Sequence, residues 1–165
     1  LDTAFSGDGK IKTNLGGYDS AYGMAVSSDK VVVAGMSDRS MYGGPHLCAI
    51  TVYTSSGALD STFSGDGKLK TSLGFPAPSI SDVVFQGQKF IVVGRTGSNG
   101  NAFLARYLAG GSLDSNFGTS GIVTTDWGGH DWYNSVVFGN SRISVVGGSR
   151  TISGVTRFII AAYEL

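Results

Sequence analysis

The chain has 165 residues, enough for one domain with a sizeable core, and its twelve basic residues balance twelve acidic ones. This neutrality gives no electrostatic footprint for nucleic acid or an anionic membrane, so neither is expected as a partner. The single cysteine, Cys48, excludes an intrachain disulfide and a four-cysteine metal site, and the longest apolar runs are only of strand length, so no membrane span is predicted.

The N-terminal third of the chain predicts four β-strands, at 11–15, 21–28, 30–37 and 47–54. These segments are rich in β-branched and aromatic residues and are bounded by Gly, Ser, Asp and Asn, which is typical of strands and turns. Short apolar runs such as 31–34 show little alternation, which indicates strands covered on both faces. No segment has a 3.6-residue period, so we expect an all-β chain.

The same pattern occurs three times along the chain. The motif LDTAF at 1–5 returns as LDSTF at 59–63 and as LDSNF at 113–117, at spacings of 58 and 54 residues. Later in each unit, VVVAG returns as FIVVG and ISVVG, and the last strand of each unit ends in tyrosine, at Tyr53, Tyr107 and Tyr163. We therefore interpret residues 1–165 as a single domain of three units, at 1–58, 59–112 and 113–165.

A four-stranded sheet with two apolar faces is not stable alone, so the three units must stack face to face. Radial stacking of such sheets is the β-propeller solution. The sequence therefore predicts a β-propeller with three four-stranded blades per chain. A β-trefoil is the alternative for a threefold repeat, although its units are usually nearer 40 residues.

The unit pattern, LDxxF-x-G-x-G-K followed by VVVAG and a strand ending in Arg-Tyr or Val-Tyr, resembles the delta-60 repeat family of predicted β-propellers. The resemblance covers the whole chain and is closest in the second unit, whereas Gly118-Thr119-Ser120-Gly121 in the third unit departs from it. It implies a propeller and frequent occurrence in secreted or surface proteins, so an extracellular or cell-surface location is expected. No established activity comes with the family.

These units are also similar to NHL repeats, in which the strand after the glycine-rich turn is the outer strand of the preceding blade. This similarity implies that 11–15 has no partner strands upstream and that 158–165 lacks an outer neighbour. Three blades are too few for a ring, because propellers use four to eight. We therefore predict a C2 homodimer that forms a six-bladed ring and removes both exposed edges. The alternative is a fragment of a longer propeller.

No residue pattern predicts a metal, a cofactor or a catalytic centre. Asp8 and Asp66 lie in identical Ser-Gly-Asp-Gly loops that could suit calcium, but the third unit keeps the loop and loses the carboxylate, so we interpret them as turns. The histidines, His46 and His130, and Cys48 fall at non-equivalent positions, which does not favour a zinc site or a nucleophile. One aspartate stands at the start of each unit, and we expect each to cap its own turn: Asp2, Asp60 and Asp114.

The candidate binding surface follows from propeller geometry, in which the loops from fourth to first strand and from second to third strand emerge on one face. Aromatic faces beside Asp and Arg suit sugar rings. The ligand-binding candidates are Tyr18, Asp19, Arg39, Phe75, Arg95, His130, Asp131, Trp132 and Arg150. Packing between blades is the alternative for Phe75 and Trp127.

We therefore predict a non-catalytic, carbohydrate-binding, lectin-like propeller with repeated weak sites. Its expected partners are a second copy of itself and glycans or a surface protein. A structural or protein-interaction scaffold without a small ligand is the alternative. The ligand itself cannot be named from the sequence.

Overall fold

The structure, a computed structural model, describes residues 1–38 and 46–164. In these residues all regular structure is β, which confirms the all-β class, and no helix is present that could span a membrane. The first sheet has the order β1-β2-β3-β4. Its strands are β1 (Tyr18–Val26), β2 (Lys30–Asp38), β3 (His46–Thr54) and β4 (Lys68–Thr71).

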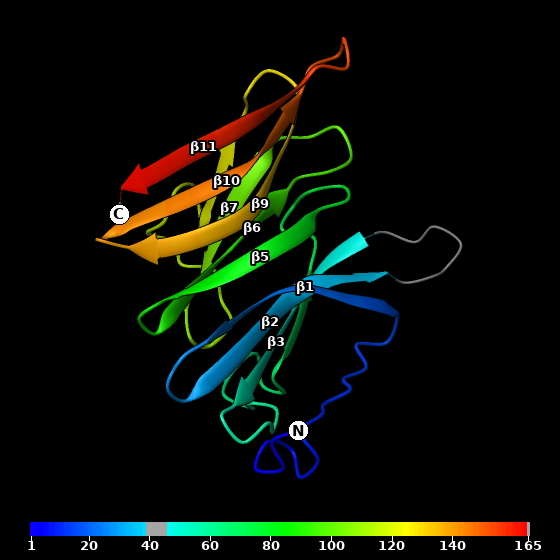
Figure 1. The fold of residues 1–165 in the computed structure, drawn as a ribbon, viewed down its shortest axis with the longest axis vertical. Coiled ribbons are helices and arrows are strands. Elements are labelled where there is room, and N and C mark those ends of the chain that lie inside the picture. The colour runs from blue at the N-terminus through cyan, green and yellow to red at the C-terminus, as the bar shows by residue number, and fades with distance from the viewer. Residues whose placement is uncertain (39–45, 165) are drawn as a thin grey trace.

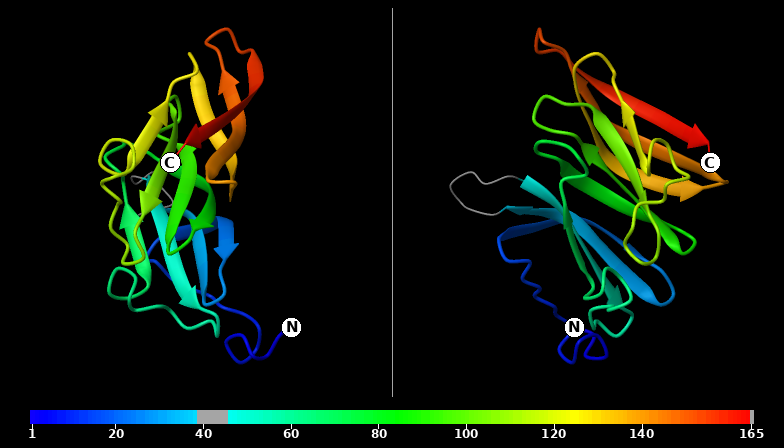
Figure 2. Two further views of the ribbon diagram at one scale, coloured as in Figure 1. Left: turned by 90° about the vertical axis from the view of Figure 1, so that its left-hand side faces the viewer. Right: turned by 180° about the vertical axis from the view of Figure 1, so that it is seen from behind.

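The second and third sheets follow along the chain and are also antiparallel. The second sheet consists of β5 (Ser79–Gln86), β6 (Lys89–Arg95), β7 (Ala102–Tyr107) and β8 (Ile122–Thr125), in that order. The third sheet consists of β9 (His130–Gly139), β10 (Arg142–Arg150) and β11 (Thr156–Glu164). The three sheets fan out one after another, with the first and third sheets at the two ends (Figures 1 and 2).

The second and third units each donate their first strand to the preceding sheet. β4 follows the second LDxxF motif in sequence yet pairs with β3, and β8 follows the third motif yet pairs with β7. The expectation that this strand is the outer strand of the preceding sheet is confirmed. The third sheet receives no such strand within the described residues, so it has three strands, not the four predicted, and β11 is its edge.

The predicted strand at 11–15 is not formed. No residue of this segment enters a sheet, although the Thr13 hydroxyl hydrogen-bonds the Tyr53 hydroxyl at 2.6 Å. The physical reason is that a strand needs a free edge to pair with. The outer edge of β3 is already occupied by β4, so 11–15 lies against the face of the first sheet.

The core lies in two layers between the three sheets. One buried cluster joins the first and second sheets, with Val32, Ile50, Val52, Ile80, Phe90 and Phe103 among its members. The other joins the second and third sheets, with Ile91, Val93, Leu104, Tyr133, Ile143 and Val145 among its members. Because successive strand residues point to opposite faces, Phe90 and Val92 join the first cluster while Ile91 and Val93 join the second. The second sheet is therefore apolar on both faces, as its lack of alternation predicted.

The first strand of each sheet, which we call its inner strand, contains a β-bulge; these strands are β1, β5 and β9. A glycine on the neighbouring strand accompanies each bulge. A Cβ at Gly94 would collide with the carbonyl oxygen of Ser79, and one at Gly35 or Gly147 would collide with the equivalent carbonyl oxygen. The glycine of the repeated VVVAG motif is therefore required by close backbone approach. The bulge itself turns one extra side chain of each inner strand out of the regular alternation.

The recurring aspartates cap their own turns, as expected. The Oδ1 atoms of Asp2, Asp60 and Asp114 accept hydrogen bonds from the backbone N–H two residues on, at 2.9, 3.0 and 3.2 Å. Two of these carboxylates also pair with the lysine that begins a strand of the preceding unit, Lys30–Asp60 and Lys89–Asp114, both at 2.7 Å. The starts of the second and third units are thereby linked to the unit before them.

Candidate functional site

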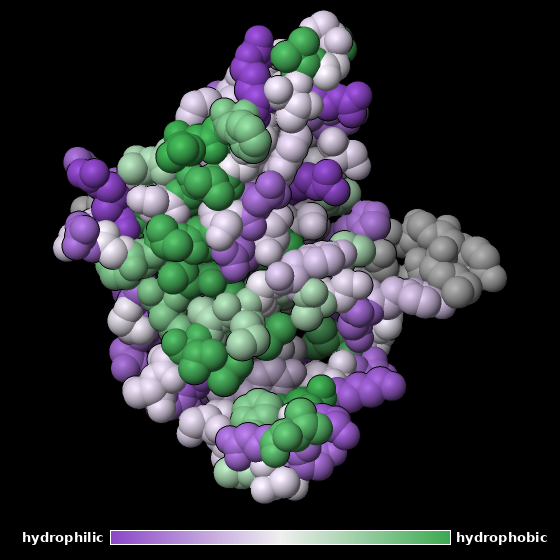
Figure 3. All heavy atoms as spheres, in the orientation of Figure 1, coloured by the Kyte–Doolittle hydropathy of each residue, from purple (hydrophilic) through white to green (hydrophobic). Residues whose placement is uncertain are grey.

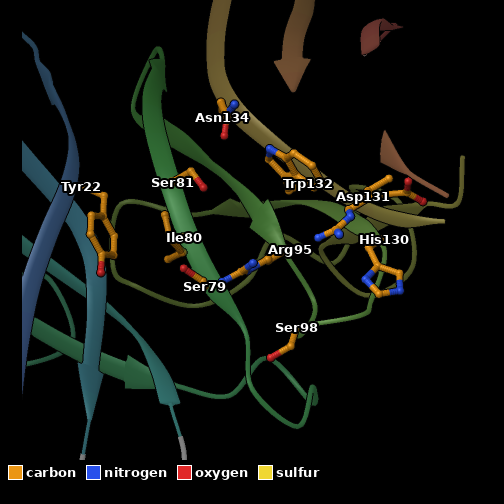
Figure 4. Close-up of a pocket in the computed structure, with 11 residues that line it drawn as sticks. Tyr22, Ser79, Ile80, Ser81, Arg95, Ser98, His130, Asp131, Trp132 and Asn134 are labelled. Carbon is orange, nitrogen blue, oxygen red and sulfur yellow. The ribbon is translucent and has the colours of Figure 1, made fainter. Parts of the chain in front are cut away.

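A groove of about 640 Å³ opens at one end of the inner strands and draws residues from all three sheets (Figure 4). This volume falls within the usual range for small-molecule sites. The lining residues are Tyr22, Ser79, Ile80, Ser81, Arg95, Ser98, His130, Asp131, Trp132, Asn134 and Arg150. Five of the nine predicted ligand residues are among them, namely Arg95, His130, Asp131, Trp132 and Arg150.

The bulges supply part of the groove wall. Tyr22, Ser81 and Asn134 are the residues skipped by the strand register in β1, β5 and β9 respectively. They occupy the same position in the three units, and all three line the groove. Figure 4 shows Tyr22 on one side of the hollow, Asn134 on the other and Ser81 on the strand between them. The groove is therefore a product of the repeat and its bulges.

Two guanidinium groups give the groove its charge. Arg95 ends β6 and Arg150 ends β10, and both residues are exposed. Within the described parts of the chain, neither side chain forms an ion pair; the ion pairs there involve Lys30, Lys89 and Arg106. His130, the register partner of Arg150, adds an imidazole. The groove thus presents two unpaired positive charges to a ligand.

The carboxylate of Asp131 stabilises the loop before β9 by accepting a backbone hydrogen bond. The residue is 1% exposed, and its Oδ2 atom accepts a hydrogen bond from the Trp127 backbone N–H at 2.7 Å. Asp19 does the same in the first unit, where Oδ2 accepts from the Leu15 N–H at 2.8 Å and Oδ1 from the Ser37 hydroxyl at 2.6 Å. Among the described residues, the Asp131 Oδ1 atom has no hydrogen-bond partner. Both aspartates position loops, and within the described residues neither forms an ion pair with Arg95 or Arg150.

Trp132 supplies an aromatic surface in the groove. Its six-membered ring lies against Gly148 on β10, where a Cβ would collide with the ring. The glycine therefore permits the indole to lie close to the strand. Trp132 is half-buried, so part of the ring faces the hollow near Arg95 (Figure 4). A partly exposed indole beside polar groups can stack on the C–H face of a sugar.

The remaining predicted ligand residues lie elsewhere. Tyr18 is exposed at the start of β1 but does not line the groove, and the Phe75 ring packs on Phe103 with ring centroids 5.7 Å apart. Packing between sheets, the alternative for Phe75, is therefore what the structure shows. Trp127 remains partly exposed and its Nε1–H donates to the Tyr133 hydroxyl at 3.4 Å. Arg39 lies outside the described residues.

Sequence reasoning missed five of the polar and aromatic lining residues: Tyr22, Ser79, Ser81, Ser98 and Asn134. Ser98 lies in the loop after β6, whereas the other four lie within or at the start of β1, β5 and β9. A signal was available in the repeat alignment, because Tyr22, Ser81 and Asn134 are equivalent and carry a polar group in all three units. Such a position marks a bulge or an axis-facing residue.

Neither a metal-binding cluster nor a reactive thiol is found among the described residues. Across 1–38 and 46–164, no three His, Cys, Asp or Glu side chains come together in a way that could hold a metal ion. Burial raises the pKa of the Cys48 thiol to about 12, so the thiolate that a nucleophile requires is scarce at neutral pH. What this groove can provide is binding, through cationic, hydroxyl, amide and aromatic groups.

Comparison with family models, with curated proteins and with solved structures finds no match to this chain. The resemblance to delta-60 repeats therefore stays a prediction. Function has to be argued from the groove itself.

Proposed function

We propose that this chain is a non-catalytic carbohydrate-binding protein whose groove takes an acidic sugar, that is, a sugar carrying a carboxylate. The observation that carries the proposal is the groove at the end of the inner strands, where Arg95 and Arg150 project without an ion-pair partner in the described chain beside the partly exposed ring of Trp132. A neutral sugar would leave both positive charges unused.

The arginine, hydroxyl, amide and indole groups of the groove each have a counterpart on such a ligand. A guanidinium binds a carboxylate through two parallel N–H···O bonds, which is both strong and directional. Ser79, Ser81 and Asn134 can exchange hydrogen bonds with sugar hydroxyls. The Trp132 ring offers a surface for the C–H face of the pyranose. The groove volume of about 640 Å³ suits one or two sugar rings.

We propose with it that the three sheets are three blades of a six-bladed propeller made by two copies of the chain, located outside the cell or on its surface. The fan of sheets, the delta-60 resemblance and the unfilled edge of β11 support this arrangement. Two copies would bring two grooves into one particle. Paired weak sites raise the avidity for a repeating polysaccharide well above the affinity of a single site.

Isothermal titration with a uronic acid oligosaccharide, compared with its neutral counterpart, tests the ligand proposal. We expect binding of the acidic sugar that weakens as salt is added. Replacing Arg95 or Arg150 by Ala should weaken binding about tenfold or more each, because a charge-assisted hydrogen bond is lost. Arg157→Ala is the matched control, because Arg157 is exposed on β11 and does not line the groove. Equal losses in all three variants would contradict the proposal.

A protein-interaction scaffold is the second candidate, because large apolar side chains are exposed on the third sheet, among them Phe158 and Ile160. If acidic and neutral sugars alike fail to bind, and one protein partner is captured in fixed ratio, this candidate replaces the first.

A further inference from the structure

The third sheet has an open apolar face. Phe158 is 100% exposed and Ile160 is 74% exposed, and Val137 and Val146 on the adjacent strands are also exposed. We call these four residues the open face of the third sheet. Hydrophobic surface gathers over the β10–β11 hairpin (Figure 3). In the second sheet the equivalent positions, Val84, Val93, Ala102 and Leu104, pack against the sheet that follows. By analogy with the second sheet, we expect a further sheet to cover this face.

The first sheet has an open face of the opposite kind. It consists of Met24, Val26, Val31 and Val33, of which Met24 and Val26 are exposed. The equivalent residues of the second sheet, Val83, Phe85, Phe90 and Val92, pack against the sheet that precedes it. One chain therefore carries one face of each kind, and the two internal interfaces already show how such faces combine. A second copy of the chain fits both.

Residues 1–15 are placed as if they completed an absent preceding sheet. The Ser6 N–H donates to the Ser56 carbonyl at 2.9 Å, just as the Ser64 N–H donates to the Gly110 carbonyl at 3.0 Å one unit later. The Thr13 hydroxyl lies 2.6 Å from the Tyr53 hydroxyl.

The same hydroxyl contact, at the same 2.6 Å, joins Thr125 of β8 to Tyr163 of the third sheet. β8 makes it as the outer strand of the second sheet, whereas 11–15 makes it without belonging to any sheet. The segment is thus held in position, while no backbone ladder joins it to the described residues.

We propose that residues 10–13 of one copy form the fourth strand of the third sheet in a second copy, with the two open faces packed together. The register follows from the internal ladders, in which Thr71 pairs with Cys48 and Thr125 with Ala102. Carried to the third sheet, the same register pairs Thr13 with Phe158. Two residues along, it pairs Ile11 with Ile160.

We call the interface between the two copies the joint. An ion pair is assigned to this joint as well. Lys30 and Lys89 begin the second strands of their sheets and pair with Asp60 and Asp114 of the following unit, both at 2.7 Å. In the third sheet this position is held by Arg142, which has no ion-pair partner within the described ranges. The residue equivalent to Asp60 and Asp114 is Asp2, so we expect Arg142 of one copy to pair with Asp2 of the second copy.

Two copies are proposed because two sets of three sheets give six blades, a number within the four to eight that propellers use. The two joints are then identical and related by a two-fold axis. This inference rests on the six-bladed ring proposed above and is independent of the ligand, so a failure of sugar binding leaves it standing.

Cysteine pairs test the joint. Ile11→Cys and Ile160→Cys are made in separate chains and mixed under mild oxidation, because facing residues of an antiparallel pair lie within disulfide reach. We expect a mixed disulfide between the two variants and none when Ser28→Cys, an exposed turn residue, replaces Ile11→Cys. The native Cys48 is buried and takes no part. Equal cross-linking by the control, or none by the designed pair, would overturn the proposal.

A charge swap gives a second readout that a misfolded variant cannot imitate. Asp2→Arg and Arg142→Asp should each weaken the dimer about threefold or more, because each places like charges together at the joint. The double variant restores an opposite pair and should recover most of the loss. Single changes without effect, or a double variant weaker than either single one, would contradict the assigned ion pair.

Discussion

Phe63 is one of the fully buried aromatic side chains of the first core layer. It belongs to the second LDxxF motif, is 0% exposed, and its ring centroid lies 5.8 Å from that of Phe90. Phe63→Ala removes a ring from a closed site, and such changes cost about 3–5 kcal/mol. For a chain of this length, each kcal/mol lowers Tm by about 2–4 °C, so we expect a fall on the order of 10 °C.

Urea denaturation at fixed protein concentration measures this effect, because association makes apparent stability depend on concentration. The midpoint should fall while the slope m is retained. Phe63→Leu is the control, since it keeps most of the volume and should cost under about 1.5 kcal/mol. If Phe63→Ala lies within about 1 kcal/mol of the unmodified chain, the Phe63 ring does not support the core between the first and second sheets.

Two further predictions concern titratable groups. The Lys30 ammonium, with help from the Thr62 hydroxyl, lowers the pKa of Asp60 from 3.8 to about 2, so its contribution to stability is complete above 3.8 and disappears as pH falls toward about 2. Asp60→Asn should therefore be less stable than the unmodified chain at about pH 5, and the difference should be lost as pH falls through about 2, as urea midpoints would show; a pH-independent difference would refute the ion pair. Because burial raises the pKa of Cys48 to about 12, a thiol reagent at about pH 8 should react only as the chain unfolds, and rapid reaction of the native protein would contradict its burial.

Much of the fold could be predicted from the repeat. The Gly-, Ser- and Asp-bounded apolar runs located β2 and β3 to within one residue, because turn chemistry and strand propensity agreed at both ends. The transfer of β4 and β8 to the preceding sheet came from the resemblance to NHL repeats. The strand at 11–15 did not form, because ladder formation depends on a partner edge and no pattern of 11–15 itself reports whether that edge exists in the same chain.

The candidate site was harder to predict, because it depends on the bulges. Arg95, Arg150 and Trp132 could be selected by residue type and loop position. Tyr22 and Asn134 could not, since regular alternation assigns a strand residue to one sheet face and a bulge redirects it. Asp19 and Asp131 were selected as polar loop residues. Backbone N–H groups compete with a ligand for such carboxylates, and in both residues one carboxylate oxygen accepts a hydrogen bond from a nearby loop N–H.

In the proposed ring, a second copy covers the open faces of the first and third sheets and pairs with the edge of β11. Sedimentation equilibrium of the unmodified 165-residue chain over a range of concentrations measures this directly. We expect a mass of twice 17.1 kDa, and a return to the single-chain mass when Ile160→Asp places a charge on the open face of the third sheet. A species of 17.1 kDa at every concentration, or a dimer indifferent to Ile160→Asp, would contradict the closed ring.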